Sequence, residues 1–111
     1  MTSGVMLKVT FFILILVAVL LEVLADVFFK KWALENKNIL LYVGLLIYFV
    51  GTISWAASLR YEYLSKAIAV FTVLNLIIAV LAGVILFKED LSLINKVGIL
   101  LGVLSVIMIE I

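Results

Sequence analysis

Four long apolar runs, separated by short charged segments, constrain the fold of this chain more than any other feature. Two of the runs carry no charge at all, and the other two carry only isolated charged side chains. About 20 residues of helix, rising about 1.5 Å each, cross a hydrocarbon core of ~30 Å. Lipid offers an open backbone no hydrogen-bond partners, so each run is expected to be helical. The runs are residues 9–29, 39–59, 67–87 and 91–109.

Composition agrees with lipid as the main solvent of the chain. Hydrophobic residues make up 68% of the 111 positions and charged residues 14%, whereas soluble domains are about half apolar and about a quarter charged. The net charge of +1 offers no basic field to nucleic acid. The chain has no cysteine and no histidine, the usual ligands of zinc and haem, and no nucleophile–base pair stands out. We therefore expect no enzyme, no metal and no cofactor.

The predicted fold class is an all-α membrane protein of four transmembrane helices, in a single domain over residues 1–111. Because the linkers are only a few residues long, consecutive helices should be antiparallel neighbours. Asp90 or Ser92 is placed to cap the fourth helix. The first run should stay in the mature chain, since acidic residues interrupt it and no cleavage site of small residues is evident. The approximate helices are 7–31, 39–60, 65–87 and 91–110.

Basic residues are nearly balanced between the two ends of the predicted helices. Cytoplasmic loops of membrane proteins normally carry an excess of them, which sets the orientation of the chain. Here three lie on one side and five on the other, so the bias is weak and insertion in both orientations is expected. The three are Lys8, Arg60 and Lys66, and the five are Lys30, Lys31, Lys37, Lys88 and Lys96.

Glu22 is the most informative residue, because it lies about two-thirds of the way along the first apolar run. An acid well inside the hydrocarbon costs about 2.5–3.5 kcal/mol on insertion scales, and such residues are functional by default. The carboxyl can exchange a proton or, when ionised, bind a cation. The alternative is a structural acid satisfied by a neighbouring helix, and we favour the functional interpretation.

Asp26 and Lys30 follow Glu22 at spacings of four residues, so the three share one helical stripe. One interpretation is an Asp26–Lys30 ion pair that closes the wide end of a cavity around Glu22. We favour it, because acid–base pairs at this spacing are ordinary in helices. The other makes Asp26 a second acidic site for a substrate with two positive charges.

Aromatic and hydroxyl side chains share a stripe of the second run. Tyr48, Thr52 and Trp55 recur there at helical spacing, and such groups suit an organic cation through cation–π contact and hydrogen bonding. Plain helix packing would explain them equally well. In the third run Asn75 is the only amide, and it should face protein or a cavity rather than lipid.

Gly98, Gly102 and Ser105 form a small-residue face in the fourth run. Small residues let helix backbones approach in a membrane, where the hydrophobic effect adds little between helices. We expect this face to hold a dimer together. The alternative is packing within the subunit, against the third helix near Gly83.

Taken together, these residues resemble those of the small multidrug resistance transporters, the four-helix branch of the drug/metabolite transporter superfamily. The resemblance covers nearly the whole chain. It rests on the chain length, on Glu22 flanked by leucines with Lys30 two turns later, on Trp55, and on the segments 67–69 and 87–93.

The resemblance implies an antiparallel, dual-topology dimer in which the Glu22 carboxylates of both subunits share one pocket. There protons and a cationic substrate compete, and the fourth helices form the dimer contact. The third run departs from that family. Ser65-Lys66-Ala67 stands where the family usually has Pro-Thr-Gly, and Val70 and Val73 stand where it usually has aromatic residues. The pair Leu74-Asn75 looks more like the lipid-sugar flippase and metabolite-carrier branches of the superfamily.

These features predict a proton-coupled antiporter in the cell (inner) membrane that exports a small organic cation. A polyamine, a guanidinium-type metabolite or a quaternary amine would fit. The expected partners are a second copy or a closely related subunit, protons, the substrate and the lipid bilayer. Two alternatives stay open. One is a lipid-linked sugar flippase or general metabolite carrier of the same superfamily, and the other is a non-transporting membrane subunit that regulates a partner.

Overall fold

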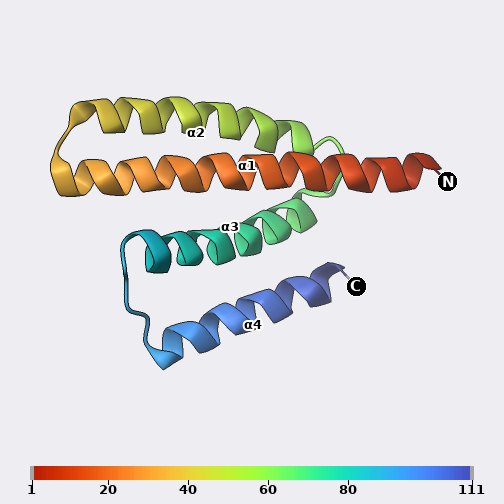
Figure 1. The fold of residues 1–111 in the computed structure, drawn as a ribbon. Coiled ribbons are helices and arrows are strands. Elements are labelled where there is room, and N and C mark those ends of the chain that lie inside the picture. Colours follow the sequence, from red (N-terminus) through yellow and green to blue (C-terminus); the bar gives the residue numbers. More distant parts are fainter. Residues whose placement is uncertain (1, 111) are drawn as a thin grey trace.

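Short connections join four α-helices in the computed structural model, which describes the backbone of residues 2–110 and the side chains of residues 4–109. Consecutive helices run in opposite directions (Figure 1). The all-helical architecture predicted from the sequence is confirmed. Within the described range the helices are α1 (Thr2–Glu35), α2 (Asn38–Ser58), α3 (Leu64–Leu86) and α4 (Leu93–Glu110).

The helix lengths differ from those predicted, most of all in α1. This helix has 34 residues, or about 51 Å at about 1.5 Å per residue, and extends beyond the predicted 7–31 at both ends. Helices α1, α2 and α3 are long and apolar enough to cross a membrane. The apolar part of α4, Leu93–Ile109, is shorter, because Leu91 and Ser92 belong to the preceding connection. The structure therefore supports three of the four predicted spans.

Local chemistry explains where α1 ends and α4 begins. Asn36 has a left-handed φ of 59°, which asparagine tolerates better than most residues, and its N–H donates to the Trp32 carbonyl at 2.7 Å. At the start of α4, the Asn95 N–H donates to the Ser92 hydroxyl oxygen at 3.1 Å and the Ser92 N–H to Asn95 Oδ1 at 3.2 Å. This reciprocal cap confirms Ser92, rather than Asp90, as the cap of the helix.

Helix α1 lies inside a flat row of helices in the order α2, α1, α3, α4 (Figure 1). The chain measures 51 × 35 × 18 Å, so its thinnest dimension is less than two helix diameters of about 10–12 Å. Helix α1 packs most extensively on α2 and also on α3, and α4 packs on α3. Because so thin a row has few interior positions, most of the buried hydrophobic side chains belong to α1.

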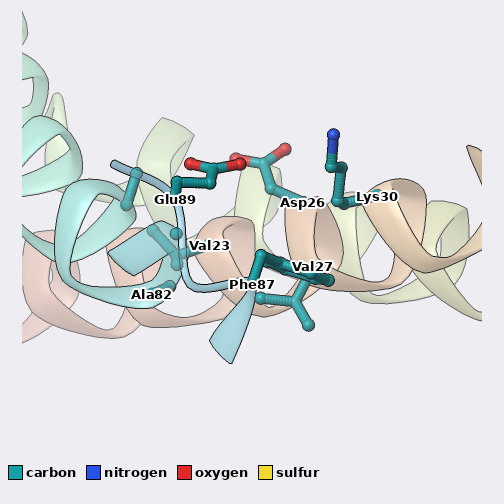
Figure 2. Close-up of a pocket in the computed structure, with 9 residues that line it drawn as sticks. Val23, Asp26, Val27, Lys30, Ala82, Phe87 and Glu89 are labelled. Carbon is teal, nitrogen blue, oxygen red and sulfur yellow. The ribbon is translucent and has the colours of Figure 1, made fainter. Parts of the chain in front are cut away.

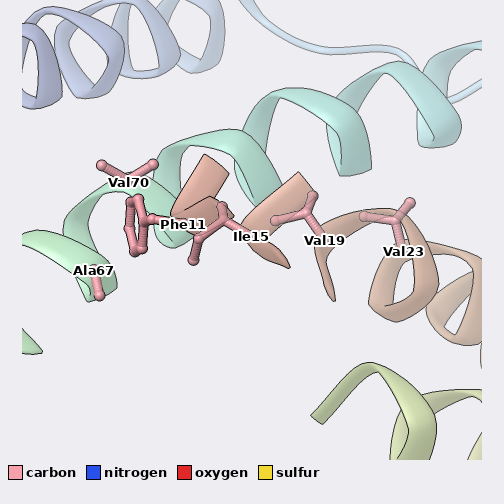
Figure 3. Close-up of a cluster of buried hydrophobic side chains, with 6 residues drawn as sticks. All are labelled: Phe11, Ile15, Val19, Val23, Ala67 and Val70. Carbon is pink, nitrogen blue, oxygen red and sulfur yellow. The ribbon is translucent and has the colours of Figure 1, made fainter. Parts of the chain in front are cut away.

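An apolar cluster between α1 and α3 forms the core (Figure 3). Its members on α1 recur every four residues, so they form one stripe along the helix. They pack against the first half of α3. The cluster consists of Phe11, Ile15, Val19 and Val23 from α1 with Ala67 and Val70 from α3.

On its other side, α1 meets α2 through a close backbone approach at Gly51, which is buried. A Cβ added there would lie 3.1 Å from Leu21 Cβ and 3.2 Å from Glu22 Cγ. The Ser54 hydroxyl also donates to the Leu14 carbonyl at 2.9 Å. Glycine at position 51 therefore lets α2 lie directly against the turn of α1 that carries Glu22.

Gly51→Leu should lower the thermal unfolding midpoint of the protein in detergent micelles, at a cost of about 1–3 kcal/mol for overpacking. Gly4→Leu is the matched control, because a Cβ at Gly4 has nothing within 4 Å. Equal midpoints for the two variants would contradict a close contact at Gly51.

Candidate functional site

A pocket of about 310 Å³ lies between α1, α2 and α3 and contains four of the residues singled out from the sequence. Helix α1 contributes one acidic side chain, α2 contributes aromatic and hydroxyl side chains, and α3 contributes apolar side chains. The lining residues are Glu22, Tyr48, Thr52, Trp55, Ile68 and Phe71. We call this space the Glu22 pocket.

Glu22 is a buried residue whose carboxyl has no partner among the described side chains. The residue is only 8% exposed, and within residues 4–109 no side-chain hydrogen bond or ion pair reaches it. No neighbouring helix of the same subunit therefore satisfies this acid through a described side chain. A carboxyl that opens into a pocket without a protein partner is suited to a proton or a cation.

The other side chains of the Glu22 pocket provide aromatic faces and acceptor oxygens. The rings of Trp55 and Phe71 lie 4.8 Å apart, tilted by 51°. The Thr52 hydroxyl donates its proton to the Tyr48 carbonyl at 2.9 Å, so its oxygen faces a ligand only as an acceptor. Aromatic faces next to a carboxyl favour an organic cation.

Sequence reasoning missed two residues of the pocket, Ile68 and Phe71 on α3. A signal for them existed, because Phe71 precedes Asn75 by four residues and follows Ile68 by three, so the three share a helical stripe. Asn75 itself lines neither this pocket nor the next one.

Asp26 lies in a second pocket, of about 150 Å³, between α1 and the C-terminal end of α3 (Figure 2). Lys30 and Glu89 line it as well. We call it the Asp26 pocket. The sequence had not singled out Glu89, because it lies in the connection between α3 and α4, and spacing alone does not say where such a residue folds.

The predicted ion pair between Asp26 and Lys30 is wrong. The one ion pair among the described side chains joins Lys37 to Glu35 at 3.5 Å, on the surface. Asp26 and Lys30 are both exposed, and both side chains extend away from α1 without converging (Figure 2). Exposed pairs of this kind gain little from contact, since solvent screens their attraction and holding both chains costs entropy.

The three residues of the predicted dimer face lie in different settings. Gly98 is exposed, with nothing within 4 Å of the position of a Cβ. Gly102 faces α3, where a Cβ would lie 3.6 Å from Leu76 Cδ2. The exposed Ser105 donates to the Leu101 carbonyl at 2.9 Å. Gly98 and Ser105 are thus free within the subunit, whereas Gly102 takes part in its internal packing.

No group of three or more histidine, cysteine, aspartate or glutamate side chains in the described part of the chain could hold a metal ion. Glu22 and Asp26 lie a full helical turn apart and line different pockets. The Glu22 pocket therefore offers one carboxyl, hydroxyl groups and aromatic rings.

Apolar helices of membrane-spanning length around a pocket that contains a carboxyl are typical of a multi-pass membrane protein. Residues 2–111 match the family model of the EamA-like transporter family, and the chain belongs to this family. It is thereby a member of the drug/metabolite transporter superfamily, as the resemblance predicted. The match does not single out the small multidrug resistance branch. No curated protein and no solved structure matches the chain significantly.

A cation that enters the Glu22 pocket should change the fluorescence of Trp55 but not that of Trp32. The chain has only these two tryptophans, and Trp32 lies outside the pocket, where its indole N–H donates to Asn38 Oδ1 at 3.4 Å. Titration with tetramethylammonium should therefore alter the emission of the Trp32→Phe variant, which retains Trp55. The emission of the Trp55→Phe variant, which retains Trp32, should stay constant. A response that survives in Trp55→Phe would place the cation elsewhere.

Proposed function

We propose that this protein is a proton-coupled antiporter that exports small organic cations across the cell (inner) membrane. The observation that carries the proposal is the carboxyl of the buried residue Glu22, which has no partner among the described side chains and opens into a pocket lined by aromatic, hydroxyl and aliphatic groups. Membership of a transporter family supports it, and favours transport over the role of a regulatory subunit. A polyamine, a guanidinium-type compound or a quaternary amine fits this chemistry.

The coupling of proton entry to cation export follows from the position of the Glu22 carboxyl in apolar surroundings. An ionised carboxylate without a partner is costly in apolar surroundings, so Glu22 is stable either with a proton bound or with a cation beside it. If the pocket opens to the opposite side of the membrane only in these two neutral states, the protein exchanges protons for cations. The ring faces of Trp55 and Phe71 favour the cation-bound state.

The working unit in this proposal is an antiparallel dimer of two identical chains, or of this chain and a closely related subunit. The Glu22 pocket lies in a row of helices only 18 Å thick, so a second subunit would close it and separate it from lipid. Gly98 and Ser105 suit the contact, because they are exposed in the single subunit and small residues allow close helix approach.

A general metabolite carrier or lipid-linked sugar flippase is the second candidate. The family match favours it, because that match lies in the broader EamA-like family rather than in the small multidrug resistance branch. Uptake driven by a pH gradient in proteoliposomes separates the candidates. A panel of mono- and dicationic amines should be transported under the first proposal, and neutral or anionic metabolites under the second.

Glu22→Gln should reduce proton-driven exchange of organic cations to the background of empty liposomes, while the protein stays folded. Glutamine keeps the shape of the side chain but cannot release a proton or neutralise a cation. Glu35→Gln is the matched control, because Glu35 pairs only with Lys37 on the surface and such pairs contribute little. Proton-driven counterflow that persists in Glu22→Gln would refute the proposal.

Single cysteines near the two ends of the chain should each react from both sides of the membrane. The chain has no cysteine of its own, so each introduced thiol reports alone. Labelling from both sides is expected because the basic residues on the two sides are nearly balanced. Labelling from one side only would mean a fixed orientation, and an antiparallel dimer would then need a related partner chain.

A further inference from the structure

The Glu22 and Asp26 pockets follow one another along the interface of α1 and α3. Glu22 and Asp26 are consecutive turns of one α1 stripe. On α3, Phe71 lines the first pocket and Ala79 the second. Asn75 lies midway between them on the same stripe, four residues from each. The two pockets are therefore neighbouring stretches of a single interface rather than unrelated cavities.

The end of α3 is shaped so that Glu89 reaches the Asp26 pocket. Lys88 has a left-handed φ of 54°, and the N–H groups of Phe87 and Glu89 both donate to the Gly83 carbonyl, at 3.1 and 3.2 Å. The chain thus folds back, and the Glu89 carboxyl occupies the space where Gly83 lacks a side chain. Figure 2 shows this carboxyl on the same side of the pocket as Asp26.

Several hydrogen-bond acceptors along this interface have no partner among the described residues. Asn75 Oδ1 is buried and unpartnered, and buried acceptors in native proteins are normally satisfied. The carboxyls of Glu22, Asp26 and Glu89 lack ion-pair partners among the described side chains, and those of Asp26 and Glu89 belong to exposed residues that a ligand can reach. Among the described residues, Lys30 is the only cationic side chain that lines either pocket. The interface is therefore suited to a ligand that brings N–H donors.

We propose that the Asp26 pocket is a second binding site on the substrate path, selective for cations that carry N–H groups. The inference rests on the proposed function and extends it. The Glu22 pocket, with its aromatic faces, accepts cations with or without N–H, since cation–π contact needs only charge. The smaller Asp26 pocket, of about 150 Å³, has two carboxyls and only one aromatic ring, that of Phe87, so hydrogen bonds decide what binds there.

The test compares two cations of equal charge and similar shape, tert-butylammonium and tetramethylammonium, of which only the first has N–H donors. A carbodiimide labels the carboxyls of the full-length protein in lipid nanodiscs, and mass spectrometry of its peptides gives the labelling rate of each. We expect tert-butylammonium to slow labelling at least fivefold at both Glu22 and Asp26. Tetramethylammonium should do so at Glu22 alone.

Gly83→Ala tests how the site is built. The added methyl group would meet the Glu89 carboxyl and displace it, so protection of Asp26 should fall while protection of Glu22 remains. Gly4→Ala is the matched control, because nothing lies within 4 Å of a Cβ there. Loss of protection at both acids in Gly83→Ala, with an altered unfolding midpoint, would mean a damaged fold. In that case Glu89→Gln is tested instead, and protection of Asp26 should again fall while protection of Glu22 remains.

The other outcomes separate the two proposals. Protection of Glu22 by tert-butylammonium with no change at Asp26 overturns the second site and leaves the proposed function standing. Equal protection of Asp26 by both cations overturns its selectivity for N–H groups. If neither cation protects Glu22, the cation antiporter itself fails, and the second site fails with it.

Discussion

The close approach of α2 to α1 at Gly51 is the contact on which the site depends. Here α2 lies against the turn of α1 that carries Glu22, and a Cβ at position 51 would be only 3.1–3.4 Å from atoms of α1. The residues that flank Gly51 on its own helix, Tyr48, Thr52 and Trp55, are brought to the acid by the same contact. In a membrane such contacts rely on close packing, because lipid provides no hydrophobic drive between helices.

Helix α1 contributes both to the apolar core and to the two pockets. One of its stripes, which includes Phe11, Ile15 and Val19, packs on α3, and a neighbouring stripe carries Glu22 and Asp26. The acids therefore lie next to the main packing stripe of α1, and among the described side chains neither has an ion-pair partner.

Helical periodicity explains how much of the site could be predicted. Tyr48, Thr52 and Trp55 were grouped by helical spacing, Glu22 was singled out as an acid within an apolar run, and the structure brings all four to one pocket. The Asp26–Lys30 pair also followed from spacing, but spacing places side chains on one face without making them touch. Asn75 was expected near the same site, and the structure instead leaves it between the two pockets, with its carbonyl oxygen unpartnered.

The sequence by itself determined that lipid surrounds most of this chain and that its secondary structure is helical. Long apolar runs require lipid and therefore helix, and an acid within such a run is predicted to be functional. Only the tertiary structure decided which helices are neighbours, that Phe71 completes the aromatic wall, and that Glu89 folds back over Gly83. The arrangement of the helices depends on contacts between residues far apart in the chain, on which local periodicity carries no information. The position of Glu89 depends on the path of the connection after α3, which has no helical periodicity.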